Sequence, residues 1–206
     1  MHIKPTKSLN YKYGKKISVL ITISILILQF NSIVNNNNPN VLGLLFFNDQ
    51  KQPVMLTYEN NSFNFKINYP NNWERSVKIN NEITFIAPKE SDTGSSPAGL
   101  VIKVVPLQLK NVSVESVSNA LISQLKKEHK DFKLESSSQF NLDGKNGKQI
   151  IFTATDNNLQ NRKAIQTITI DRNNIIIITY KASIDKYTQY ENVIKDMISS
   201  FKFLYK

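Results

Sequence analysis

The 206-residue chain contains no cysteine, which excludes disulfides, thiolate metal sites, cysteine nucleophiles and a lipid-modified N-terminal cysteine. Only two histidines are present, His2 and His129, and they lie far apart in the sequence. A histidine metal site or a Ser-His-Asp triad would therefore depend on His129 alone. Glycine is sparse, and neither Gly-x-Gly-x-x-Gly nor a Walker pattern is present to bind phosphates. We predict no catalytic residue, no metal site and no cofactor.

The formal net charge of +10 by itself suggests nucleic-acid binding, but the charge is unevenly distributed along the chain. Five lysines and no acidic residue precede residue 17, whereas residues 49–206 carry 21 basic and 16 acidic side chains, a net charge of +5. These later charges are interspersed, as on a solvated surface, and no basic cluster contains interleaved aromatic residues. We therefore predict no nucleic-acid partner.

Residues 1–34 have the pattern of a secretory leader, because a basic segment precedes an apolar run at 17–28. The twelve residues 17–28 suit the core of a signal peptide, whereas 17–34 approach the ~20 residues that cross a bilayer, so cleaved signal peptide and signal anchor both stay open. A buried helix is disfavoured, because lysines precede the run and an asparagine tract follows it. Since positive charge stays inside, we predict that the rest lies outside the cytoplasmic membrane, either secreted or anchored by residues 17–34.

Residues 35–55 form an asparagine-rich spacer with little to pack. It contains a second apolar burst at 41–47, which is too short to span a membrane and either lies in the membrane interface or packs onto the domain. We predict that residues 56–206 form the folded domain.

Alternating apolar residues dominate the start of this domain. Residues 62–69 place Phe63, Phe65, Ile67 and Tyr69 at every second position, which predicts a strand with one apolar face. Pro70 ends the strand, because proline cannot donate to a ladder. The only tryptophan, Trp73, follows and is placed to close over that face. Tyr69, Pro70 and Trp73 form either the rim of a recognition groove or an aromatic plug, and a lone tryptophan beside such a strand favours the plug.

The remaining pattern predicts an α+β fold, with a mainly antiparallel sheet and helices packed on it. Four consecutive isoleucines at 175–178 leave no polar side, so their strand should be central and covered on both faces. Asp143-Gly144 and Asn146-Gly147 are turn dipeptides. The predicted strands are 83–87, 100–105, 148–155, 163–170 and 175–182; the predicted helices are 113–130 and 190–201.

Tyr58, Phe63-x-Phe65 and Tyr69-Pro70-x-x-Trp73 together resemble the opening signature of PsbP-like domains. The order of the later elements, which ends in a helix at Ser200-Phe201, is similar as well, so the resemblance covers about residues 56–203. It implies a non-enzymatic α/β/α sandwich that docks on other proteins outside a membrane. It does not imply photosynthesis, because the basic N-terminal segment of the photosynthetic subunit has no counterpart after the leader.

Other candidate sites are few. Asn60 and Asn111 begin N-glycosylation sequons, two matches that an asparagine-rich chain reaches near chance. The turn-rich segment 88–99 is either a functional loop or a flexible surface loop. His129 lies where a protonated imidazole would meet a helix C-terminus favourably, which explains it better than a catalytic role.

These observations favour a binding or accessory domain that docks on a membrane or envelope protein. An alternative is a carrier of a small ligand or lipid, which would need a cavity between sheet and helix. A secreted hydrolase that uses carboxylates is the third hypothesis, although no two acidic residues have a spacing that forces them together.

Overall fold

The computed structural model describes residues 53–78, 81–89, 97–107, 111–156 and 160–205. The predicted leader (1–34), the apolar burst at 41–47 and most of the spacer lie outside these residues. Among the described helices, none is long and apolar enough to cross a membrane.

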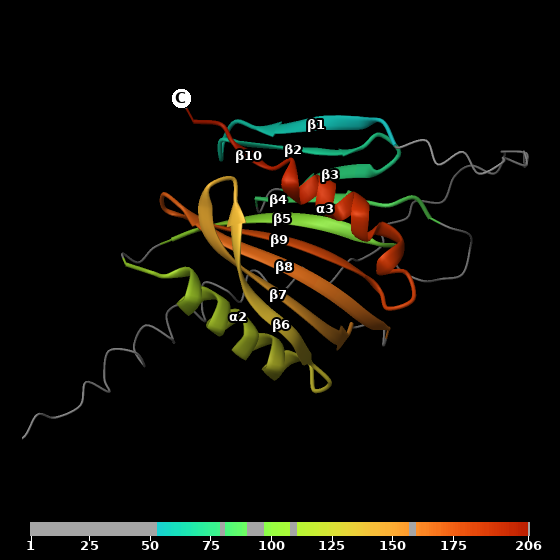
Figure 1. The fold of residues 1–206 in the computed structure, drawn as a ribbon, viewed down its shortest axis with the longest axis vertical. Helices are drawn as coiled ribbons and strands as arrows, with labels where there is room; N and C mark the ends of the chain where they lie inside the picture. Colours follow the sequence, from blue (N-terminus) through green and yellow to red (C-terminus); the bar gives the residue numbers. More distant parts are fainter. Residues whose placement is uncertain (1–52, 79–80, 90–96, 108–110, 157–159, 206) are drawn as a thin grey trace, which may run out of the picture.

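Two antiparallel sheets form the domain, which confirms the predicted α+β class (Figure 1). The larger sheet has the strand order β3-β4-β5-β9-β8-β7-β6, and the smaller has the order β1-β2-β10. The strands of the larger sheet are β3 (Glu74–Lys78), β4 (Glu82–Ile86), β5 (Gly99–Pro106), β6 (Lys133–Leu142), β7 (Lys145–Thr155), β8 (Asn161–Asp171) and β9 (Asn174–Ser183). Those of the smaller are β1 (Met55–Asn60), β2 (Phe65–Pro70) and β10 (Lys202–Phe203).

The isoleucine strand β9 lies in the middle of the larger sheet, as predicted, between β5 and β8. Its four isoleucines are at most 2% exposed. Successive side chains alternate between the faces, so Ile175 and Ile177 pack toward one helix while Ile176 and Ile178 pack toward the other. The continuous apolar run thus reflects burial on both sides.

Helix α2 (Val114–Glu128) covers one face of the larger sheet, over β7 and β8 (Figure 1). It begins as predicted, because Ser113 is its N-cap and the hydroxyl accepts a hydrogen bond from the Ser116 amide at 3.1 Å. The side of the helix that faces the sheet is buried at Val117, Leu121 and Leu125.

Helix α3 (Glu191–Ser199) follows the 3-10 turn η2 (Thr188–Tyr190) and packs on the opposite face, beside the smaller sheet. The main core lies between these elements and the larger sheet. Phe65 of β2 stacks on Phe201 at 5.1 Å between ring centroids, and both side chains are at most 1% exposed. The smaller sheet and α3 therefore bury a common apolar face.

Two details of the sequence prediction were wrong. The first long strand begins at Phe65, because Asn64 adopts a left-handed φ of 52° in the turn after β1. Phe63 therefore lies outside the strand, although its side chain still packs partly buried against the core. Asn146 and Gly147 belong to β7, and only Asp143-Gly144 forms the turn, with φ of 48° and 82° that suit a type I′ hairpin.

Candidate functional site

A groove of about 410 Å³ lies between α3 and the sheet face opposite α2. Its walls come from η2 and α3 on one side and from β6, β7, β8 and β9 on the other. The apolar and aromatic lining residues are Phe140, Ile151, Ile165, Tyr180, Tyr187, Ile194 and Ile198; the polar ones are Gln149, Lys163, Thr188, Glu191, Lys195 and Ser199.

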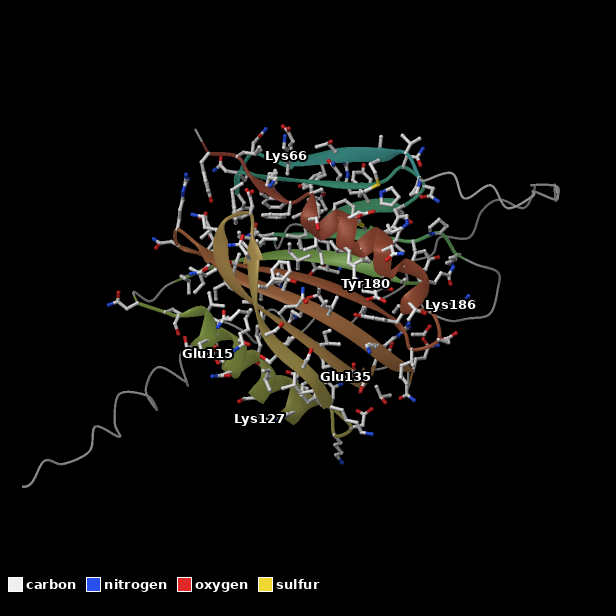
Figure 2. All side chains as sticks on the ribbon, in the orientation of Figure 1. Lys66, Glu115, Lys127, Glu135, Tyr180 and Lys186 are labelled. Carbon is white, nitrogen blue, oxygen red and sulfur yellow. The ribbon has the colours of Figure 1, made fainter. Side chains whose placement is uncertain are left out.

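Strand register makes the floor of the groove apolar. Ile151 of β7 stands opposite Ile165 of β8, which in turn stands opposite Tyr180 of β9, so the three side chains form one row on the same face. The Tyr180 hydroxyl donates to the Tyr187 carbonyl oxygen at 2.9 Å, and burial raises the pKa of this phenol. Tyr180, labelled in Figure 2, is thus a fixed part of the floor close to α3.

Charged pairs mark one end of the groove. Lys163 Nζ lies 2.6 Å from Glu135 Oε2 and 5.1 Å from the centre of the Tyr187 ring. Glu135 is the extra residue of a β-bulge in β6, where Leu134 pairs with Phe152 and Ser136 already pairs with Ile151. On the opposite wall, Lys195 Nζ lies 3.0 Å from Glu191 Oε1. Two cations and two anions therefore balance at this rim.

The pKa of Tyr187 gives a test of this arrangement. Burial, with Glu191 and Glu135 adding to it, raises this pKa to about 12. An unfolded tyrosine titrates near pH ~10, so the stabilisation is complete below that pH and is lost as the pH rises toward 12. Between pH 9 and 11, urea unfolding should show the wild type losing about 1 kcal/mol more stability than Tyr187→Phe. Equal losses in both proteins would contradict the buried placement of this phenol.

The structure places the sequence-predicted motif away from the groove. Phe65, Tyr69 and Trp73 are at most 7% exposed, and Pro70 is buried as the last residue of β2. Trp73 meets Tyr190 edge to face at 5.6 Å, on the side of the core that the small sheet covers. None of these side chains lines the groove. Sequence reasoning missed the groove residues, whose only signal was the partly polar alternation of β7 and β8.

Other predicted positions are also accounted for. His129 is the C-cap of α2, and its Nδ1 lies 2.9 Å from the Thr155 carbonyl oxygen. Asn111 is exposed, whereas the side-chain amide of Asn60 donates to the Tyr58 hydroxyl at 3.1 Å. Glycosylation therefore stays a prediction, with Asn111 as the more accessible acceptor. Of the loop at 88–99, residues 90–96 lie outside the described ranges.

Buried charges elsewhere form ion pairs. Arg162 Nε lies 2.9 Å from Asp156 Oδ2, and Lys103 Nζ lies 3.8 Å from Glu82 Oε2. Burial lowers the pKa of Lys103 and brings that of Lys181 to about 7. Within the described part of the chain, no group of three or more acidic or histidine side chains is placed to hold a metal ion. Removing one partner of such a pair would leave an uncompensated charge in the interior.

The fold and the groove define the protein as an α+β sandwich domain with a largely apolar groove under its last helix. The PsbP family model matches residues 54–203, and the chain belongs to this family. No curated protein matches the sequence.

Three solved structures share the fold at low sequence identity. Cyanobacterial PsbP (CyanoP) from Synechocystis sp. PCC 6803 is 15% identical with a TM-score of 0.56, and the match covers 78% of this chain and 98% of that one. LpqN of Mycobacterium tuberculosis, described as involved in cell envelope biogenesis, is 11% identical with a TM-score of 0.54 and coverages of 76% and 88%. PA94 of Pseudomonas aeruginosa, a putative regulator of unknown function, is 15% identical with a TM-score of 0.52 and coverages of 71% and 94%.

Proposed function

We propose that this protein is an extracytoplasmic, non-enzymatic accessory domain that docks on a membrane or envelope protein through the groove under α3. The main observation that supports this proposal is the groove. Its floor is apolar, its polar end has balanced ion pairs, and it leaves Ile151 and Ile165 only partly buried. A partner that covers such a surface gains apolar burial without leaving a charge unpaired.

The location is supported by the leader and by one structural relative. Residues 1–34 have the basic and apolar pattern of a secretory segment. LpqN, which shares the fold, is described as taking part in cell envelope biogenesis.

Intact mass and fractionation of the native protein test the location. A full-length mass in the membrane fraction indicates a signal anchor, and a soluble extracellular chain that begins between residues 30 and 45 indicates a cleaved signal peptide. Full-length protein in the cytosolic fraction would contradict the proposal.

Photo-crosslinking tests the docking surface. A photoreactive amino acid at Lys195, exposed on the groove wall, should give a discrete protein adduct in intact cells. The matched control is Lys127, an exposed helical lysine on α2 at the other face of the sheet (Figure 2). Identical adducts from both positions, or none from Lys195, would overturn the assignment of the groove.

A second function, carriage of a small apolar or amphipathic ligand, is favoured by the volume of the groove. Small-molecule sites commonly enclose roughly 300–1,000 Å³, a range that includes this groove of about 410 Å³. Native mass spectrometry of protein purified from its own cells should then show an additional mass. Ile165→Trp, which fills the floor, should remove that mass, and a ligand-free wild-type spectrum would exclude stable carriage.

A further inference from the structure

We propose that an extended segment of the partner protein adds to β6 as a further antiparallel strand and lays alternate apolar side chains into the groove. This inference rests on the proposed function of the groove and specifies how the partner binds there. The evidence is the exposure of β6, the direction of its free backbone groups and the small side chains along its groove-facing side.

Strand β6 is an exposed edge of the larger sheet. It is the last strand in the order, and the described part of the chain places no strand beyond it. Residues 133–139 are all exposed. An exposed edge presents unpaired N–H and C=O groups along its length, to which another chain can add.

The geometry of the β6–β7 hairpin determines which backbone N–H and C=O groups of β6 are not bonded to β7. Leu142 and Lys145 flank the two-residue turn and form its closing hydrogen-bonded pair. Because bonded and non-bonded pairs alternate in an antiparallel ladder, Phe140, Ser138 and Ser136 also bond to β7. The intervening residues therefore point one N–H and one C=O each away from the sheet. These residues are Ser137, Gln139 and Asn141.

Only short side chains lie between this edge of the sheet and the groove. Ser136 stands opposite Ile151, and Ser138 stands opposite Gln149, both of which line the groove. Side chains of an added strand that stand opposite these serines lie on the same face, within ~5 Å at Cβ. Large apolar side chains can extend across the serines toward Ile151, the nearest apolar residue of the groove floor. The ligand is therefore an extended segment with apolar residues at every second position.

The two edges of the sheet differ in their protection against such pairing. Edge strand β3 carries Glu74, Arg75 and Lys78 within five residues. In β6 the residues from 136 to 142 contain no charge, and the bulge at Glu135 limits pairing to this stretch. Charged side chains are the usual device that blocks edge pairing, and β6 lacks them where it borders the groove.

Alternate N-methylation of a peptide tests the backbone pairing. The probe is a fluorescent ten-residue peptide with Phe and Leu alternating with Thr and Lys, added to the full chain in nanodiscs, with empty nanodiscs as a blank. The Thr and Lys amides should face β6, so methylating them should weaken binding at least about tenfold, as expected for three lost hydrogen bonds. Methylating the Phe and Leu amides should change the affinity less than about threefold. Equal effects of the two methylations, or no anisotropy change with the parent peptide, would overturn the proposal.

Variants of β6 test the same edge from the side of the protein. Gln139→Pro removes an outward N–H that no β7 bond uses, so the hairpin should fold and peptide binding should fall at least about tenfold, whereas Gln139→Thr should bind normally. Ser138→Lys places a long charged side chain between the edge of β6 and the groove. Its control Ser137→Lys places the same charge on the other face of the sheet. We expect weaker binding only for Ser138→Lys, with thermal unfolding of each variant to verify its fold. Unchanged binding of both Gln139→Pro and Ser138→Lys would overturn strand addition.

The result can be separated from the proposed function. If Lys195 still crosslinks the same protein in Gln139→Pro, the groove docks a partner but β6 does not pair with it. If Lys195 gives no adduct in the wild type, the proposed function itself fails. Sedimentation of the full chain adds a further outcome, because a dimer that Gln139→Pro dissociates would identify a second copy as the occupant and would overturn the choice of a partner protein.

Discussion

Ile178→Asp is expected to prevent folding. Ile178 is fully buried on the central strand β9, with Ile102 and Thr167 as its cross-strand neighbours. Its side chain faces the main core that α3 and the smaller sheet cover. Burying a carboxyl group there without a partner lowers the free energy of unfolding by several kcal/mol even in its protonated, neutral form, and the cavity left by the smaller side chain adds to the loss. Since small domains have about 5–15 kcal/mol of total stability, the variant should be insoluble or lack cooperative urea unfolding.

Two neighbouring substitutions serve as controls. Ile178→Val removes one methylene and should cost about 0.5–1.5 kcal/mol, with a normal cooperative transition. Ile177→Asp places the carboxylate on the opposite face, where Lys103 is the cross-strand neighbour. We expect Ile177→Asp to be less damaged than Ile178→Asp, because the Lys103 ammonium, which already lies 3.8 Å from Glu82 Oε2, is positively charged and stands opposite the new carboxylate. Soluble, cooperatively unfolding Ile178→Asp would show that β9 is not central.

The strands that could be predicted from sequence are those that bury side chains. The isoleucine run of β9 and the alternating residues of β2 are read directly, since each apolar residue reports a buried position. Both helices were predicted to within a few residues because their apolar stripes follow helical spacing. The α+β class follows from these elements.

Edge strands could not be predicted in the same way. Strand β6 reads KLESSSQFNL, and seven of its ten residues are exposed in succession. Its conformation is imposed by the ladder to β7 and by the Asp143-Gly144 turn, so its own side chains carry no apolar period. Strand β3 was missed for the same reason.

The groove depends on a juxtaposition that no local pattern contains. Ile151 and Ile165 meet Ile194 and Ile198 only because α3 returns to the sheet after the last long strand. The bulge that directs Glu135 toward Lys163 is likewise invisible in the sequence, because it results from the pairing of two strands. The resemblance to PsbP-like domains correctly identified the family, yet its motif residues belong to the core.

Trp73→Ala is expected to produce the second large effect, a loss of about 3–5 kcal/mol in the free energy of unfolding. Trp73 is 6% exposed, its ring meets Tyr190 edge to face, and its amide donates to the Pro70 carbonyl oxygen at 3.0 Å. The substitution leaves the backbone bond in place and removes the aromatic side chain that closes the core between β2 and η2. Urea unfolding measures the change in midpoint.

The control for this substitution is Val77→Ala on the next strand, since Val77 is 58% exposed and should change stability by less than about 0.5 kcal/mol. Crosslinking from Lys195 tests whether Trp73 belongs to the core or to the proposed docking surface. If Trp73 is a core plug, Trp73→Ala protein that is kept below its unfolding midpoint should still give the Lys195 adduct. An unchanged midpoint combined with loss of the adduct would instead place Trp73 on the docking surface, and the assignment of the motif to the core would be wrong.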